Sequence, residues 1–263
     1  MKYVLLTGAY GGMGKSVANY LKEKGYTVFA LDKTVGEQED GIIPIPCDLT
    51  DQNSVDDALT YVSSITNSLD AILHFGGIYR LDSLVEMEEK DFLSTFDVNV
   101  FGAYRINKTF LPLLKKGSRI VITSSELAPL DPLPFTGVYA ITKSALEKYA
   151  YSLRMELQLL GIDVVVLRPG AVKTSMLGDS TTALDKFCQK TTLYNCNAKR
   201  FKSIVEKVEA KNIPPKKVAK LTAKILKAKR PKFVYSINRN PLLLLLNVLP
   251  QRLQTWIIKL ILK

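Results

Sequence analysis

Tyr139 and Lys143 have the residue types and the spacing that acid–base chemistry needs. If their segment is helical, residues four apart lie on one face. A free phenol has a pKa of about 10, too high for proton transfer at neutral pH, and a neighbouring ammonium lowers that pKa. Lowering this pKa to neutrality takes about 4 kcal/mol of extra stabilisation of the phenolate. A lysine supplies part of that energy, and a bound cationic cofactor ring would supply more. The same spacing also occurs on ordinary amphipathic helices, so the rest of the sequence has to decide between the two interpretations.

Two serines precede this pair at the end of a predicted strand. Ser124 and Ser125 follow the apolar run of residues 119–123. In a parallel sheet, the end of a strand is where ligands bind, so a hydroxyl there can hold a substrate oxygen.

A glycine-rich turn near the start of the sequence predicts a nucleotide site. Residues 3–7 are an apolar run typical of a buried parallel strand, and residues 15–24 have helical spacing. Glycines between them let the backbone turn tightly and let a pyrophosphate approach the helix N-terminus, where free amides and the helix dipole favour negative charge. These glycines are Gly8, Gly12 and Gly14.

Asp32 ends the next apolar run, residues 27–32, and bears on the choice of cofactor. A carboxylate at this point can accept hydrogen bonds from both hydroxyls of an adenosine ribose. A 2′-phosphate would meet like charge, so the sequence favours NAD over NADP. The adjacent Lys33 keeps NADP open.

Residues 9–16 also resemble a P-loop, which would bind a nucleoside triphosphate. That motif needs glycine at position 9, where this sequence has Ala9, and Gly8 lies one residue too early. Loop length decides which amides face a phosphate, so the match fails on geometry, and a nucleotide triphosphatase is not expected.

Strands alternate with helices as far as residue 235, which predicts an α/β fold: a Rossmann-like, doubly wound parallel sheet with helices on both faces. Ligands in such a sheet bind at the carboxyl ends of the strands. The predicted strands are residues 3–7, 27–32, 42–48, 70–77, 119–125, 163–170 and 232–235, and the predicted helices are residues 15–24, 50–63, 92–114, 139–160 and 214–230.

Taken together, these features resemble the short-chain dehydrogenase/reductase family over residues 1–235. No single match is specific, but their order and spacing together are. The resemblance implies a Rossmann fold, a nicotinamide cofactor and hydride transfer between a secondary alcohol and a ketone. The matches are Thr7, Gly8, Gly12, Gly14, Asp32, Asp48, Asn99, Ser125, Tyr139, Lys143, Pro169, Gly170 and Thr174.

The resemblance also implies a role for each matched residue. Tyr139 would be the acid/base at the substrate oxygen, and Lys143 would bind the nicotinamide ribose and lower the tyrosine pKa. Ser125 would donate a hydrogen bond to the same oxygen, and Asn99 would hold a water that relays the proton outward. The cofactor would further contact Thr7, Gly8, Gly12, Met13, Gly14, Asp32, Asp48, Leu49, Gly76, Pro169, Gly170, Val172 and Thr174.

The sequence departs from the family pattern at two places. The family usually has Asn-Asn-Ala-Gly after the fourth strand, whereas residues 74–77 are His-Phe-Gly-Gly. The link between strands that the asparagine amide makes must therefore be made otherwise, and we interpret His74 as a packed or hydrogen-bonded strand residue. Ser125 also lies one residue further from the tyrosine than usual. Either Ser124 or Ser125 can be the oxygen ligand, and we prefer Ser125.

Two segments after the catalytic motifs are expected to deal with the substrate and the surroundings. Residues 173–200 would be a substrate lid, with apolar residues that suit a steroid-, retinoid- or sphingoid-like substrate; the alternative is a surface loop with a short helix. The predicted division is a catalytic domain of residues 1–236 and an amphipathic tail of residues 237–263. The lid's apolar residues are Met176, Leu177, Phe187, Leu193 and Tyr194.

The tail is oily and basic. Residues 199–263 hold 17 of the 36 Lys and Arg residues but only 2 of the 25 Asp and Glu residues. Pro250 and Lys259 interrupt the apolar run, which therefore falls short of the roughly 20 residues that span a bilayer. With Trp256 and nearby cations, we expect the tail to lie in an anionic membrane surface; a subunit contact or a cap over the active site is the alternative. Its predicted polar stripe is Asn247, Gln251, Thr255, Lys259 and Lys263.

Cysteine and histidine counts narrow the remaining possibilities. The three cysteines show no Cys-x-x-Cys spacing, so we expect reduced thiols in a cytoplasmic protein, attached peripherally to a membrane by its tail. One histidine excludes a multi-histidine metal centre, and no metal is expected. The tail lacks arginine-rich recognition character, so no nucleic-acid partner is expected. The resemblance implies a homodimer or homotetramer. The alternative function is a non-catalytic, membrane-tethered dinucleotide-binding sensor.

Overall fold

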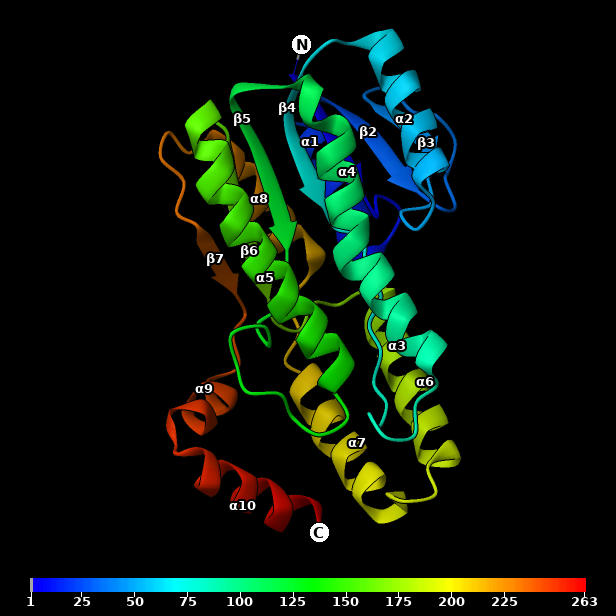
Figure 1. Ribbon diagram of the computed structural model, residues 1–263, viewed down its shortest axis with the longest axis vertical. Helices are drawn as coiled ribbons and strands as arrows, with labels where there is room; N and C mark the ends of the chain where they lie inside the picture. The colour runs from blue at the N-terminus through cyan, green and yellow to red at the C-terminus, as the bar shows by residue number, and fades with distance from the viewer. Residues whose placement is uncertain (1) are drawn as a thin grey trace.

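A single sheet of parallel strands organises the chain, in the order β3-β2-β1-β4-β5-β6-β7 (Figure 1). The structure is a computed structural model that describes residues 2–263, with the side chains of residues 2–174, 182–208 and 210–263. The strands are β1 (Lys2–Thr7), β2 (Tyr26–Asp32), β3 (Ile42–Pro46), β4 (Leu69–His74), β5 (Leu114–Thr123), β6 (Asp163–Pro169) and β7 (Val234–Ile237).

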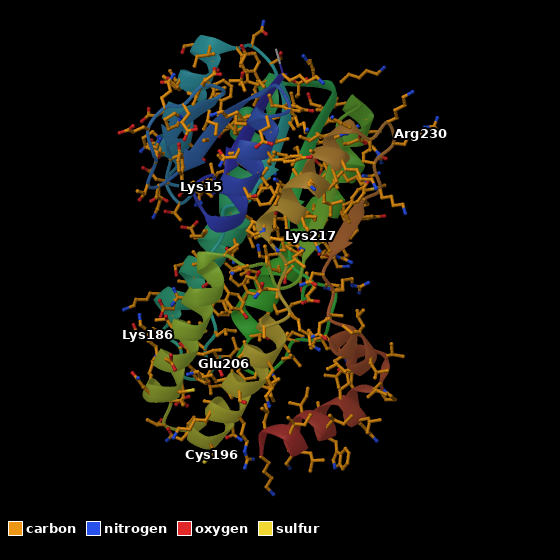
Figure 2. The ribbon with its side chains drawn as sticks, turned by 180° about the vertical axis from the view of Figure 1, so that it is seen from behind. Lys15, Lys186, Cys196, Glu206, Lys217 and Arg230 are labelled. Carbon is orange, nitrogen blue, oxygen red and sulfur yellow. The ribbon has the colours of Figure 1, made fainter. Side chains whose placement is uncertain are left out.

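Helices cover both faces of this sheet. One face carries α2 (Gln52–Ile65), α4 (Gly102–Phe110) and α5 (Gly137–Leu157), and the other carries α1 (Gly12–Lys22) and α8 (Pro215–Lys227). Seen from behind, α1 and α8 lie side by side, with Lys15 and Lys217 marking their first turns (Figure 2). The predicted doubly wound parallel sheet is therefore confirmed.

Successive side chains along each strand pack into two cores, one on each face of the sheet. In β1, Leu5 packs with the core under α2, α4 and α5, whereas Val4 and Leu6 pack under α1 and α8. All three are fully buried. A strand covered on both faces must be apolar at successive positions, which is why the strands read as continuous apolar runs.

The order of the strands places a crevice at the ends of β1 and β4. From β1 the chain runs outward through β2 and β3, then returns to β4 on the other side of β1 and continues outward to β7. Ligands of doubly wound sheets bind where the strand order reverses in this way. Gly8 follows β1, and Gly76 and Gly77 lie just beyond the end of β4.

Beyond the carboxyl ends of the strands lies a separate helical layer (Figures 1 and 2). It consists of α6 (Ser175–Lys190), α7 (Asn195–Glu209), α9 (Pro241–Val248) and α10 (Gln251–Leu262). A small apolar cluster of buried residues holds α6, α7 and α10 to the segment after β4. Its buried members are Leu81, Leu184, Phe201 and Leu262.

Two helix predictions were wrong in their boundaries. Residues 92–114 form not one helix but α3 (Glu89–Phe96), a π-turn (Asp97–Phe101) and α4, followed by a 3₁₀ turn at Leu111–Leu113 that leads into β5. Pro112 sits in this turn; it has no N–H for another helical bond, so the helix ends before it. The predicted helix of residues 139–160 runs from Gly137 to Leu157 and ends in a 3₁₀ turn, Gln158–Leu160.

The segment predicted as a substrate lid extends beyond residues 173–200. It forms two helices, α6 and α7, between Ser175 and Glu209, and not the alternative of a surface loop with a short helix. Phe187 is buried against Phe135, and Tyr194 packs on the same ring. Leu193 is exposed. The side chains of Met176 and Leu177 lie outside the described part of the chain.

The tail forms two helices, α9 and α10, but its polar stripe is not purely solvent-facing. Asn247 Oδ1 accepts the backbone N–H of Asp131 at 2.8 Å, which ties the tail to the loop after β5. The buried polar residue of α10 is Gln254, which donates to Asp131 Oδ2 at 3.2 Å and to the Leu249 carbonyl at 2.8 Å. The predicted stripe missed Gln254 because α9 stops at Val248 and the break at Pro250 re-aims the second helix. The division between residues 236 and 237 stays a prediction.

Candidate active site

The backbone of the glycine turn after β1 forms one wall of a cavity of about 270 Å³. Gly8 has a φ of +65°, and a Cβ there would lie 2.5 Å from the backbone nitrogen of Gly76. A Cβ on Gly14 would lie 2.0 Å from the Gly8 carbonyl oxygen. Only glycine fits at both positions, and the first turn of α1 opens into the resulting space. A helix N-terminus with a glycine turn is a ready site for a pyrophosphate.

Acidic and basic side chains close the far end of this cavity. Asp32 Oδ2 accepts the backbone N–H of Tyr10 at 2.9 Å, which fixes the carboxylate beside the glycine turn. Lys33 pairs with Asp48 at 2.8 Å. Asp48 Oδ1 also accepts the Thr50 hydroxyl at 2.7 Å. The cavity therefore ends in two carboxylates, one of which is already neutralised by a lysine.

The structure brings Tyr139 and Lys143 together on α5, one turn apart. The ammonium of Lys143 lies 5.6 Å from the centroid of the Tyr139 ring. Its Nζ donates to the Thr123 carbonyl at 3.1 Å, so the end of β5 holds the lysine in place. Ser125 follows β5 and shares a hydrogen bond with the Tyr139 hydroxyl. Ser124 instead donates to the Lys143 carbonyl at 3.4 Å.

Burial shifts the pKa values of both members of this pair. Burial raises the pKa of Tyr139 to about 12, and the hydrogen bond with Ser125 counteracts this only in part. Burial also lowers the pKa of Lys143 to about 8. Lys143 is not among the groups that shift the pKa of Tyr139, and its ammonium donates to Thr123; its effect on the tyrosine pKa with a cofactor bound stays a prediction. At neutral pH both groups carry their protons.

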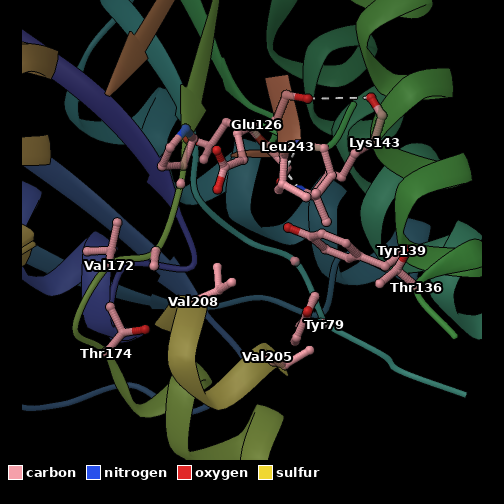
Figure 3. Close-up of a pocket in the computed structure, with 18 of the residues that line it drawn as sticks. Tyr79, Glu126, Thr136, Tyr139, Lys143, Val172, Thr174, Val205, Val208 and Leu243 are labelled. Atoms are coloured by element: carbon pink, nitrogen blue, oxygen red, sulfur yellow. Dashed lines mark hydrogen bonds between the residues drawn. The ribbon is translucent and has the colours of Figure 1, made fainter. Parts of the chain in front are cut away.

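A second cavity, of about 210 Å³, opens directly onto Tyr139 (Figure 3). Ser124, Ser125, Lys143, Pro169, Gly170 and Val172 line it, as expected from the sequence. The two cavities adjoin each other, because five residues line both of them: Met13, Phe75, Gly77, Ile78 and Thr174. The predicted contacts Gly12, Leu49 and Gly76 belong to the first cavity, with Gly8, Gly14, Asp32 and Asp48.

Two predicted residues line neither cavity. Thr7 is fully buried behind the glycine turn, where its Oγ1 accepts the backbone N–H of Gly76 at 3.3 Å. Asn99 lies in the π-turn; its Oδ1 accepts the Ile78 N–H at 2.8 Å, and its Nδ2 donates to the Thr142 hydroxyl at 3.1 Å. Both side chains hold neighbouring backbone in place. The role of Asn99 as a water ligand stays a prediction.

Comparison with known proteins decides the family. The family described as short chain dehydrogenase matches residues 2–185. The chain belongs to this family. Its members are NAD(P)-dependent oxidoreductases, so the predicted family and enzyme class are confirmed at that level.

Curated members of the short-chain dehydrogenase family include two informative relatives. Mouse estradiol 17-beta-dehydrogenase 2 is 33% identical over 191 residues, which cover 67% of this chain and 50% of that protein. The 3-ketodihydrosphingosine reductase of Bacteroides thetaiotaomicron is 26% identical over 231 residues, 88% of this chain and 85% of that protein. The chain thus spans about half the length of the mouse relative. A solved short-chain dehydrogenase from Streptomyces avermitilis, 21% identical, shares the fold with a TM-score of 0.75 over 90% of this chain and 88% of its own.

Phe75 stands where the family usually has an asparagine, and only its backbone bonds to the neighbouring strand. Phe75 is buried in the core, and its backbone N–H donates to the Thr7 carbonyl at 3.1 Å, which links the ends of β1 and β4. His74 is buried and its Nε2 lies 2.8 Å from Asn107 Oδ1. Asn107 in turn donates to the Tyr149 hydroxyl at 3.0 Å. The interpretation of His74 as a hydrogen-bonded strand residue agrees with this chain of contacts.

The sequence analysis missed the distal wall of the second cavity. This wall comes from α7, from α9 and from the segments after β4 and β5, far apart in sequence. Nothing in the local pattern marks these residues, because only the packing of α7 and α9 brings them to Tyr139. The missed residues are Tyr79, Glu126, Phe201, Val205, Val208 and Leu243.

Proposed function

We propose that this chain interconverts a lipophilic ketone and its secondary alcohol. NAD(P), which the glycine-lined cavity fits, would supply or accept the hydride. Tyr139 exchanges the proton with the substrate oxygen, Ser125 donates a hydrogen bond to that oxygen, and Lys143 holds the nicotinamide ribose. The observation that carries the proposal is that the glycine-lined cavity adjoins the cavity at the Tyr139 hydroxyl, with five residues shared by both.

The raised pKa of Tyr139 favours the direction of reduction. A phenol with a pKa of about 12 holds its proton at neutral pH. It can give that proton to an oxygen that becomes an alkoxide as hydride arrives, and Ser125 is placed to bind the same oxygen. Oxidation needs the phenolate first, so we expect ketone reduction to be the faster direction at neutral pH.

An apolar distal wall supports a lipophilic substrate. Phe201, Val205 and Val208 of α7 and Leu243 of α9 surround the space in front of Tyr139 (Figure 3). Apolar surface of this kind contributes about 25 cal/mol for each Å² removed from water. Two relatives named for a steroid and for a sphingoid substrate support the same class.

We infer that NAD is preferred over NADP. Asp32 is held at the adenosine end of the cavity by Tyr10, where it would repel a 2′-phosphate. The nearby cation, Lys33, is already paired with Asp48. The ratio of kcat/KM for NADH over NADPH should exceed about 10 and should fall in Asp32→Ala. A wild-type preference for NADPH would contradict this inference.

Tyr139→Phe tests the proposed function and separates it from a non-catalytic sensor. Loss of a general acid should lower ketone reduction by about 100- to 10,000-fold, while NADH binding, followed by fluorescence, stays within about threefold. Tyr151→Phe, an exposed tyrosine on the same helix, is the matched control and should keep full activity. Equal activity in both variants would overturn the proposal. Failure of the wild type to reduce any member of a lipophilic ketone panel would do the same.

We further infer that the tail docks on an anionic membrane surface beside the second cavity. No helix among residues 2–263 combines the length and the apolarity needed to cross a bilayer. Yet α9 and α10 expose large apolar side chains, and residues 210–263 contain no acidic residue. Leu243, on the inner side of α9, lines the cavity itself. The exposed side chains are Leu242, Leu245, Val248, Leu253, Trp256, Leu260 and Ile261.

Vesicle co-sedimentation tests this docking. The double variant Trp256→Glu, Leu260→Glu should lower binding to vesicles of phosphatidylcholine and phosphatidylserine by about 10-fold or more, because two apolar anchors become charged. The matched control is Leu159→Glu, a similarly exposed leucine at the opposite end of the molecule. Equal binding of both variants to the vesicles would contradict this inference.

We also infer a homodimer through the outer face of α4 and α5. Tyr104 on α4 and Ile141, Tyr151 and Met155 on α5 are exposed there, as is Phe101 just before α4. Sedimentation velocity should show a dimer at micromolar concentration, and a monomer would contradict the inference.

A further inference from the structure

Glu126 places a carboxylate inside the second cavity, next to the proposed oxygen ligand Ser125. Its side chain is only 8% exposed, although glutamate is rarely buried. The carboxylate and the Tyr139 hydroxyl point into the same space, between Leu243 and Val208 (Figure 3). A charged group therefore lies where the head of a substrate would bind.

The protein supplies a hydrogen-bond donor to only one oxygen of this carboxylate. Oε2 accepts the backbone N–H of Asn240, the N-cap of α9, at 2.6 Å. Among the described residues, Oε1 has no hydrogen-bond donor and no cation forms an ion pair with the group. The cation that acts on this carboxylate electrostatically is Arg239, which is exposed. Gly170 keeps the space beside Oε1 open, because a Cβ there would lie 2.8 Å from it.

An incompletely paired buried carboxylate is costly unless something compensates its charge. Burial raises the pKa of Glu126, and the Asn240 N–H and Arg239 oppose that rise only in part. The hydrogen bond to Asn240 alone does not require a charge, because a glutamine oxygen would accept the same N–H. A carboxylate at this position is better explained by a cation that enters the cavity.

We propose that Glu126 binds a protonated amine of the substrate, on the carbon next to the carbonyl that Ser125 and Tyr139 bind. This inference rests on the proposed function and narrows its substrate to long-chain amino ketones and amino alcohols of the sphingoid type. Steroids and retinoids carry no such amine. The ammonium would donate to Oε1 while the alkyl chain lies along Val205, Val208 and Leu243.

Three probes of equal chain length test the proposal in the full chain: a long-chain 2-amino-3-ketone, its N-acetyl derivative and the plain 3-ketone. A charge-assisted hydrogen bond should raise wild-type kcat/KM for the amino ketone roughly 10- to 100-fold over the other two. Glu126→Gln keeps the shape and the bond to Asn240 but loses the charge. It should remove most of that preference and bring the ratio of kcat/KM for the amino ketone over the plain ketone close to 1.

The outcomes separate this inference from the proposed function. Turnover of the plain ketone reports on hydride transfer, whereas the ratio of kcat/KM between the amino ketone and the plain ketone reports on the amine. If the wild type reduces all three probes equally, or if Glu126→Gln slows them all equally, Glu126 only supports α9 and the inference is overturned. Should the variant fail to fold, as judged by its thermal unfolding, the wild-type preference among the three probes still decides.

Discussion

The two cavities of this protein meet at Met13 and Thr174 but are built in different ways. The first is shaped by backbone: Gly8 and Gly14 leave no room for a side chain, and α1 offers its N-terminus. The second is shaped by side chains from α5, α7 and α9 and from the segments after β4 and β5. A backbone-built cavity tolerates few sequences, whereas a wall of side chains can be changed one residue at a time.

This difference explains which half is common to a family and which half sets the substrate. The glycine turn only has to fit a dinucleotide, which is the same in every member. The distal wall has to fit one substrate, and its helices α7 and α9 lie beyond the carboxyl ends of the strands rather than on a face of the sheet (Figure 1). Substitutions in the first half should therefore affect every reaction, and those in the second should affect some substrates only.

Gly14→Ala should break the first half and has the largest expected effect. The new Cβ would lie 2.0 Å from the Gly8 carbonyl oxygen, so the turn has to open. NADH affinity, measured by fluorescence titration, should fall roughly 100-fold or more. Gly11→Ala in the same turn is the comparison, since its Cβ would lie 3.3 Å from the same oxygen and should weaken NADH binding less than Gly14→Ala does. Similar affinities in the two variants would mean that the turn does not shape the site.

The buried His74 should make the folded protein less stable at acidic pH. Burial lowers its pKa to about 4 from 6.5, so in this window the unfolded chain binds more protons than the folded chain. The free energy of unfolding therefore decreases as pH falls from 6.5 to 4, and this group accounts for about 3 kcal/mol of the decrease. Urea unfolding across this range should show a flatter pH dependence for His74→Gln. An unchanged slope would contradict the assigned burial.

Substitution of Ser124 and of Ser125 tests which of the two hydroxyls binds the substrate oxygen. Ser125→Ala should lower kcat roughly 10- to 100-fold, because Ser125 shares a hydrogen bond with Tyr139 and is proposed to bind the substrate oxygen. Ser124→Ala should change kcat by less than about threefold, since Ser124 donates to the Lys143 carbonyl at a long 3.4 Å. Steady-state kinetics on one ketone compares the two. The reverse order would assign the role to Ser124.

The same contrast accounts for what could be predicted from sequence. Gly8, Gly14, Asp32, Tyr139 and Lys143 stand out because each needs a particular residue type near the end of a strand or on one face of a helix. The alternation of strands and helices follows from the burial of both sheet faces.

What escaped prediction depends on packing between distant segments. Glu126 and Leu243 meet only because α9 begins beside the segment that follows β5, and no local pattern encodes that. The surroundings of Tyr139 escaped prediction for a related reason. Spacing places Lys143 one turn away, but only the structure shows that its ammonium is directed to Thr123.

Deuteride transfer in a single turnover tests the central claim most directly. Enzyme loaded with NADH deuterated at the transferable position is mixed with a lipophilic ketone, and the product alcohol is analysed by mass spectrometry. The account predicts deuterium on the carbinol carbon within one turnover and, in Tyr139→Phe, transfer at least about 100-fold slower with NADH still bound. Product without deuterium, or transfer at the wild-type rate without the Tyr139 hydroxyl, would contradict it.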